Sequence, residues 1–203
     1  AAQVYPTSGS KYAFEVQNNA SGVLTVQHSG NQPGLAYSAL GELTLAAPTV
    51  RQAGRVVAPL GSIRLLSQNI VRTGAGATAV TRTGAAGGTV ELAAGSVTSV
   101  SAAGMLLPFG QTTLSGKEWN YVIGALDILP LTATPQPGVT LNAENVLLRS
   151  ADGGKAAARV DLSGGGDLQA WEWIPGTGGS ADVLSAAKTA DTYAIVPSLR
   201  TAY

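Results

Sequence analysis

The chain has 203 residues, of which 45% are hydrophobic and 12% charged, and its 12 basic and 12 acidic side chains give zero net charge. This length and apolar fraction fit one domain, or at most two, with a hydrophobic core, and they exclude charge-driven disorder. Zero net charge argues against a general nucleic-acid binder, which needs an excess of Lys and Arg. The absence of cysteine excludes disulfides, Cys-based zinc sites and thiol nucleophiles.

The amino-terminal segment, AAQVYPTSGSKYAFEV, has neither the basic region nor the apolar region of a signal peptide. No apolar stretch approaches the roughly 18 residues that a membrane-spanning helix needs, so we expect no membrane span. We interpret the chain as part of a longer protein whose export signal, if it has one, lies outside this segment.

An internal repeat begins at residue 22. Glycine followed by alternating apolar and other residues occurs in 22–26, 41–45, 61–65 and 88–92, and residues 138–141 and 158–162 are two less regular copies. The first apolar residues of the copies are Leu24, Leu43, Ile63, Val90, Val139 and Val160. A second apolar residue follows several copies by five positions, at Val50, Ile70, Val97 and Val146.

Alternation with a period of two residues predicts strands. A strand, a short corner and another strand, repeated about every 20 residues, predict a right-handed parallel β-helix in an all-β chain. Stacking coils roughly 4.8 Å apart buries a column of aliphatic side chains and pairs the backbone groups. We therefore expect β-helix coils over residues 1–104. If Arg64 and Glu91 lie on neighbouring coils, they can pair across the strands.

Two segments interrupt the repeat. The glycine-rich run 74–88 is predicted to be a corner loop, because it follows no strand-to-helix pattern. Residues 105–137 contain four prolines, which disfavour central strands. We predict that 105–137 is an irregular excursion, packed on the flank of the β-helix.

Residues 138–203 are predicted to return to β-helix coils and to end in a loop and a short helix. The run Ser163–Asp167 suits a turn with positive φ angles. Ser180 is a candidate cap for a helix over 181–188.

Charge is uneven along the chain. Five arginines and no acids lie between Leu43 and Val90, whereas nine acids and five bases lie between Lys117 and Asp191. These arginines are candidates for contact with acidic glycans or a neighbouring subunit, against the simpler interpretation of a solvated face. They are Arg51, Arg55, Arg64, Arg72 and Arg82.

Trp119, Trp171 and Trp173 are the other candidates for glycan or subunit contact. Trp171 and Trp173 are two residues apart and therefore share one face of a strand. A satellite core under the excursion is favoured over a sugar-stacking platform.

Catalytic signals are weak, and we expect no enzymatic activity, cofactor or metal. His28 is the only histidine, and no Gly-x-Ser-x-Gly element marks a nucleophile. The acids of the second half could still supply the carboxylate pair of a polysaccharide-cleaving β-helix. They are Asp152, Asp161, Asp167 and Glu172.

Segments GELTLAAPTV (41–50), APLGSIRL (58–65) and GTVELAAGSV (88–97) resemble the β-helical repeats of filamentous haemagglutinin-like exoproteins. Residues 160–184, with YAIVP at 193–197, are similar to a domain of unknown function in the same proteins. The resemblance implies a Gram-negative surface or secreted protein that is exported through an outer-membrane transporter. It implies a role in adhesion, aggregation or biofilm matrix, and it carries over no catalytic residue.

We therefore expect a structural or adhesive segment of such an exoprotein, located at the cell surface or secreted. A glycan-binding or glycan-cleaving β-helix is the alternative. Open sheet edges promote further strand pairing, so we hypothesise that the segment either self-associates end to end into fibres or is continued by more chain in the parent protein.

Overall fold

The computed structural model describes residues 2–7, 11–16, 21–28, 30, 39–73, 79–112, 119–122, 128–131 and 136–172. These residues form strands and no helix, so the expected all-β class is confirmed. Accordingly, the described ranges contain no helix long and apolar enough to cross a membrane. The chain divides into two compact units: Ala1–Phe109 with Ala133–Gln169, and Gly110–Thr132 with Ala170–Tyr203.

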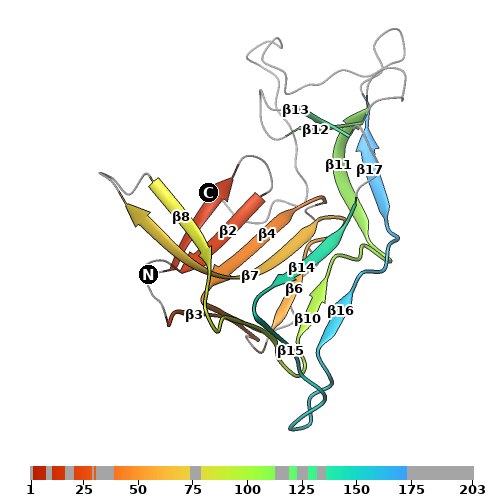
Figure 1. The fold of residues 1–203 in the computed structure, drawn as a ribbon. Coiled ribbons are helices and arrows are strands. Elements are labelled where there is room, and N and C mark those ends of the chain that lie inside the picture. Colours follow the sequence, from red (N-terminus) through yellow and green to blue (C-terminus); the bar gives the residue numbers. More distant parts are fainter. Residues whose placement is uncertain are drawn as a thin grey trace, which may run out of the picture. The chain divides into compact units, whose positions relative to one another are not determined.

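Three parallel sheets make up most of the first unit (Figure 1). The first parallel sheet contains β2 (Lys11–Val16), β4 (Glu42–Ala47), β7 (Ser62–Thr73) and β14 (Gly138–Asn142). The second contains β3 (Val23–Gln27), β5 (Thr49–Ala53), β9 (Thr89–Leu92) and β15 (Asn145–Leu148). The third contains β6 (Arg55–Val57), β10 (Val97–Ser99) and β16 (Arg159–Asp161).

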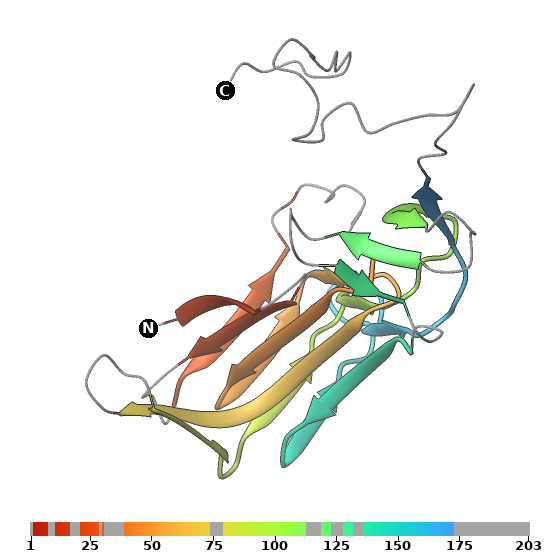
Figure 2. The same cartoon turned by 90° about the horizontal axis from the view of Figure 1, so that it is seen from above.

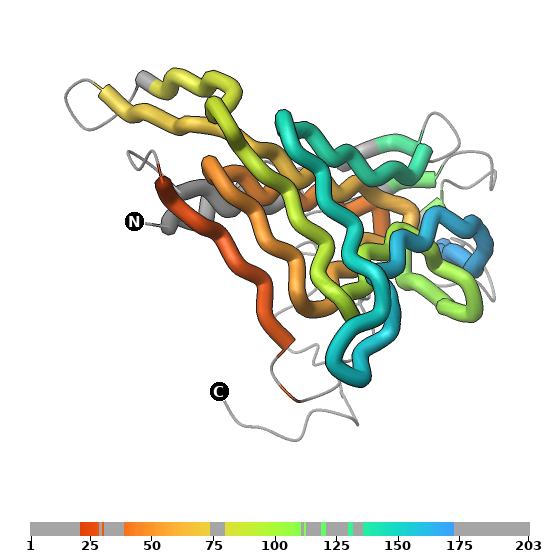
Figure 3. Tube along the Cα trace, turned by 60° about the horizontal axis from the view of Figure 1, so that its bottom comes forward, coloured from red at the N-terminus to blue at the C-terminus, as the bar shows by residue number. Residues whose placement is uncertain are grey.

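The chain enters the three sheets in a fixed order. It passes through β4, β5 and β6, then through β7, β9 and β10, and then through β14, β15 and β16. Each strand pairs in parallel with the equivalent strand of the preceding set. Figure 3 shows β3, β5, β9 and β15 side by side in the colour order red, orange, yellow-green and teal.

The first strand of the chain does not follow this pattern. β1 (Ala2–Thr7) runs antiparallel to β2 and occupies the outer edge of the first parallel sheet. A reversed strand ends the parallel stacking on that side. The sequence pattern does not reveal this reversal, because strands with antiparallel and parallel partners share the same period of two residues.

Aliphatic side chains stack in register in the interior of the first unit. Leu43, Ile63 and Val139 lie opposite one another on three neighbouring strands of the first sheet. In the second sheet, Val50 and Val90 are fully buried at matching positions. These residues belong to one hydrophobic core that all three sheets share. The expected stacking of aliphatic side chains on neighbouring strands is therefore confirmed for the first sheet.

The predicted alignment of the repeat copies was wrong for three of them. Val90 and Leu24 lie in the second sheet, where Val50 is their common partner, and Val160 lies in the third sheet opposite Thr98. Apolar alternation marks an inward-facing strand on any of the three sheets. It does not say which sheet the strand joins.

The glycine-rich run 74–88 is not a simple corner loop. β7 continues past its neighbour β4, and the chain returns as β8 (Ala79–Gly84), which pairs antiparallel with β7 from Gln68 to Thr73 (Figure 2). This hairpin lengthens the interval between Ile63 and Val90.

Two stacked corners use leucine in the left-handed region. Leu40 and Leu60, each just before a repeat glycine, have φ angles of 61° and 56°. The backbones of Gly41 and Gly61 approach closely, because Ser62 N donates to Gly41 O at 2.9 Å. A Cβ atom added to Gly61 would collide with that carbonyl oxygen, which explains why glycine begins these copies.

Gln52 is a polar side chain in the buried column. Gln52 is fully buried in register with Leu92. Its Nε2 donates to the carbonyl oxygens of Val97 at 2.9 Å and Gly54 at 3.1 Å, and its Oε1 accepts from Gly54 N at 2.8 Å. Because these bonds pair both Nε2 and Oε1, burial leaves neither polar atom of the Gln52 side chain without a partner.

The predicted irregular excursion contains regular strands. β11 (Leu106–Thr112), β12 (Trp119–Val122) and β13 (Ile128–Pro130) fall within 105–137, and β12 pairs antiparallel with β11 and β13. Pro130 is the last residue of its strand, where a missing N–H is tolerated. β17 (Asp167–Trp171) is the last described strand. The helix predicted over 181–188 lies outside the described residues.

The stack predicts different costs for the same substitution at two matched positions. Leu92 and Leu148 face each other in the second sheet, but Leu92 is 0% exposed and Leu148 is 58% exposed. We expect Leu92→Ala to lower the free energy of unfolding by about 2–5 kcal/mol, and Leu148→Ala by less than about 1 kcal/mol. Urea denaturation measures both. Equal losses would mean that Leu148 is covered in solution.

Candidate functional site

The five candidate arginines are spread over the first unit. Arg51 lies on β5, Arg55 on β6 and Arg64 on β7, so these three occupy three different sheets. Arg72 and Arg82 lie on the two strands of the β7–β8 hairpin. The charge asymmetry of the sequence therefore does not correspond to one continuous row of arginines. A role in glycan or subunit contact stays a prediction for each of them.

The condition for pairing Arg64 with Glu91 is not met, because the two residues lie in different sheets. Arg64 lies in the first sheet, opposite Thr44, whereas Glu91 lies in the second sheet, opposite Arg51. The two residues had been assigned equivalent positions because their repeat copies look alike. The misaligned copy at 88–92 accounts for the error.

An open groove of about 690 Å³ lies over β5, β9 and β15 of the second parallel sheet, and we call it the charged groove. Its charged residues are Arg51, Glu91, Arg149, Asp152 and Lys155. Small residues line much of the rest of the groove. Among them are alanines of β5 and of the turn after β9. All of these residues belong to the first unit.

Glu91 links two arginines in this groove. Arg149 Nε donates to Glu91 Oε1 at 2.9 Å, and Arg51 Nε lies 3.7 Å from Glu91 Oε2. Glu91 stands between buried Val90 and Leu92, so strand alternation directs its side chain away from the core. The two arginine side chains are 54% and 52% exposed, and that of Glu91 is 18% exposed.

Lys155 borders the groove from the loop after β15. Its aliphatic stem lies against Gly95, where a Cβ atom would approach the Lys155 side chain to 3.3 Å. Gly95 has a φ angle of 79° and donates its N–H to Ala156 O at 2.6 Å. The absence of a side chain at Gly95, in the turn after β9, thus leaves room for the side chain of Lys155.

Sequence reasoning did not single out Arg149 and Lys155. Both lie in the acid-rich part of the chain, far from the arginine-rich segment. Correct alignment of 145–148 with 89–92 would have placed Arg149 beside the end of β9, close to Glu91.

The candidate tryptophans are only partly described. Trp119 begins β12, opposite Thr112, and is half-buried. Trp171 ends β17 and is 48% exposed. Trp173 lies outside the described residues, so the expected shared face of Trp171 and Trp173 stays a prediction.

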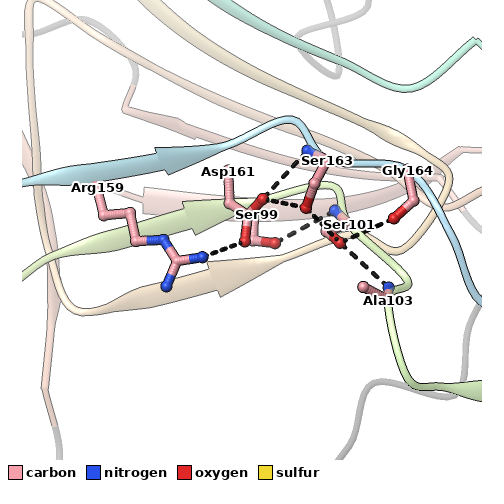
Figure 4. Close-up of polar contacts among 7 residues, drawn as sticks. All are labelled: Ser99, Ser101, Ala103, Arg159, Asp161, Ser163 and Gly164. Atoms are coloured by element: carbon pink, nitrogen blue, oxygen red, sulfur yellow. Dashed lines mark hydrogen bonds and ion pairs between the residues drawn. The ribbon is translucent and has the colours of Figure 1, made fainter.

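A polar network surrounds Asp161 in the third sheet (Figure 4). Ser163 donates to Asp161 Oδ1 from its hydroxyl at 2.6 Å and from its backbone N–H at 3.1 Å, and Arg159 Nη2 donates to Oδ2 at 2.7 Å. The bonds from Ser163 first, and the Arg159 charge second, hold the pKa of Asp161 below its ordinary value of 3.8.

The same network joins neighbouring turns. The hydroxyl oxygens of Ser163 and Ser101 lie 3.0 Å apart, and Ser101 Oγ accepts from Ala103 N at 3.1 Å. Ser101 is buried, and Ser163 is bound to a carboxylate rather than to a histidine base. We therefore assign these serines to turn stabilisation and not to nucleophilic chemistry.

The other candidate chemical groups have different local surroundings. His28 is exposed, and its Nδ1 accepts from Gly30 N at 3.0 Å. Asp152 lies in the charged groove, whereas Glu172 accepts a hydrogen bond from Thr112 in the second unit. Within the described ranges, no group of three or more His, Cys, Asp or Glu side chains is arranged to hold a metal ion.

Comparison with known proteins finds no matching family model, no matching curated protein and no matching solved structure.

The Asp161 network predicts a pH-dependent stability. Because the pKa of Asp161 is lowered in the fold, its charged form stabilises the protein above about pH 4, and this contribution is lost as pH falls through the folded pKa. We expect Asp161→Asn to lower the melting temperature at pH 7 and to have less effect at pH 3. Thermal unfolding followed by circular dichroism measures the difference.

Ser163→Ala is the companion variant for this test, because it removes the hydroxyl donor and keeps the charge. It should show a smaller version of the same pattern. A difference between wild type and Asp161→Asn that is constant from pH 7 to pH 3 would contradict the assigned network.

Proposed function

We propose that this chain is a right-handed parallel β-helix segment with a structural and adhesive role in a large bacterial exoprotein. The cyclic order of strands through three parallel sheets supports this architecture. In a β-helix, each coil contributes one strand to each face and stacks on the previous coil. The three successive sets of strands described above have this relation.

The observation that carries the proposal is the change in exposure along the stack. In the middle set, Ile63 on β7, Val90 on β9 and Val100 just after β10 are fully buried. In the last set, Val146 on β15 is 40% exposed opposite Val90, and Leu162, the residue after β16, is 59% exposed. Each earlier set of strands is covered by the set that follows it. Among the described residues, no further set covers Val146 and Leu162. A surface of this kind suits continued stacking, which is the basis of fibre formation and aggregation.

The repeat segments resemble those of filamentous haemagglutinin-like proteins. This resemblance is the basis for proposing how the parent protein is exported and where it acts. On that basis, the parent protein passes through an outer-membrane transporter and acts at the surface of a Gram-negative cell or after secretion. Adhesion, aggregation and biofilm matrix are the activities proposed for it.

The alternative of a glycan-cleaving β-helix makes a distinct prediction. A polysaccharide lyase releases unsaturated sugars that absorb ultraviolet light. We expect no such product when the chain is incubated with polygalacturonate, and absorbance at the wavelength of the unsaturated product measures it. Steady release of that product by purified protein would replace the structural proposal with the enzymatic one.

The direct test of the structural proposal is self-association through the last set of strands, β14, β15 and β16. We expect the wild-type chain to associate with increasing concentration, and Val146→Lys with Leu162→Lys to abolish this association. Charged lysines at exposed strand positions oppose edge-to-edge pairing. Sedimentation velocity and electron microscopy measure the assemblies.

Val71→Lys is the matched control, because Val71 is a 42% exposed valine on the β7–β8 hairpin and not on the last strand set. It should associate like the wild type. A wild-type chain that stays monomeric at every concentration, or equal loss of association in the control, would overturn the proposal.

A further inference from the structure

We propose that the charged groove binds a linear polysaccharide bearing carboxylate groups. This inference rests on the proposed adhesive function and names a ligand class for it.

The two guanidinium groups keep most of their hydrogen-bonding capacity. A guanidinium has five N–H donors, and the contacts of Arg51 and Arg149 with the described residues use only Nε. Among the described residues, no acceptor therefore occupies the four donors on the two terminal nitrogens of each side chain. Their planar geometry suits a carboxylate, which accepts two parallel bonds from one guanidinium.

Glu91 orients the arginines without occupying those donors. Its side chain is 18% exposed, compared with more than half for each arginine, so the carboxylate lies deeper than the positive groups. With Lys155, the groove holds three positive side chains against the two carboxylates of Glu91 and Asp152. The surface that meets solvent therefore favours an anion.

The spacing of the arginines favours a chain of anionic groups over a single small anion. Arg51 and Arg149 belong to β5 and to the end of β15, which are separated by β9. Neighbouring strands are about 4.8 Å apart, so the two backbones lie roughly 10 Å apart. The guanidinium groups lie closer together than the backbones, because each contacts a different oxygen of Glu91. A polymer that crosses the strands can meet both arginines with successive carboxylates.

The open form of the groove favours a polysaccharide among such polymers. Small-molecule sites are enclosed and mostly apolar, whereas Ala53 and Ala93 leave this surface shallow and open. A nucleic acid requires many more positive charges than a chain of zero net charge presents. A polymer of hydroxyl and carboxylate groups needs no deep pocket and meets the exposed donors directly.

The test is binding of the full chain to immobilised polygalacturonate, measured by biolayer interferometry at low and high salt. Wild type should bind, and binding should weaken as salt screens the charges. The variant Arg51→Gln with Arg149→Gln should bind at least about tenfold more weakly, because it removes two charge-assisted contacts. Lys155→Gln should also weaken binding, and it leaves the contacts of Glu91 intact.

Arg64→Gln is the matched control, an exposed arginine of the first sheet outside the groove, and it should bind like the wild type. Unchanged binding in both groove variants, or equal loss in the control, overturns the proposal. Binding to neutral dextran, or to dextran sulfate or poly-glutamate but not to polygalacturonate, overturns the carboxylated-polysaccharide assignment. Such a failure leaves the self-association test unaffected, since Val146 and Leu162 lie outside the groove lining.

Discussion

The structure depends on the stacking of equivalent side chains on neighbouring parallel strands. Leu45, Leu65 and Leu141 lie opposite one another, and the first two are almost completely buried. No single strand set can bury its own apolar side chains, because each strand has only one inward face and needs the next set to cover it. Stability therefore comes from repetition, and the last set is the most exposed.

Polar groups follow the same register as the apolar ones. Gln52 occupies a column position and satisfies its amide with the backbone of the adjoining corner and of the next strand set. Ser101 and Ser163 meet at equivalent turns of neighbouring sets. Hydrogen bonds between stacked corners thus align the same turns that the aliphatic column brings together, which makes the two contributions mutually dependent.

The same strand register aligns the outward-facing side chains of the second parallel sheet. Parallel pairing of β5, β9 and β15 places a carboxylate between two arginines without any dedicated loop or cofactor. An exposed ion pair of this kind adds little to stability, roughly 0.2–1 kcal/mol, so its main consequence is the position of the charges. The groove is therefore a product of the scaffold, and the proposed glycan contact needs no departure from the repeat.

The sequence by itself determined the all-β class and which residues face inward, since alternation at Leu43, Ile63 and Val139 depends only on neighbours along the chain. Only the tertiary structure decided the partners. Val90 pairs with Val50 rather than with the look-alike Ile63, and Glu91 meets Arg149 across 58 residues. The physical reason is that register across sheets depends on turn geometry and on insertions such as the β7–β8 hairpin. Neither turn geometry nor such an insertion can be recognised from apolar alternation with a period of two residues.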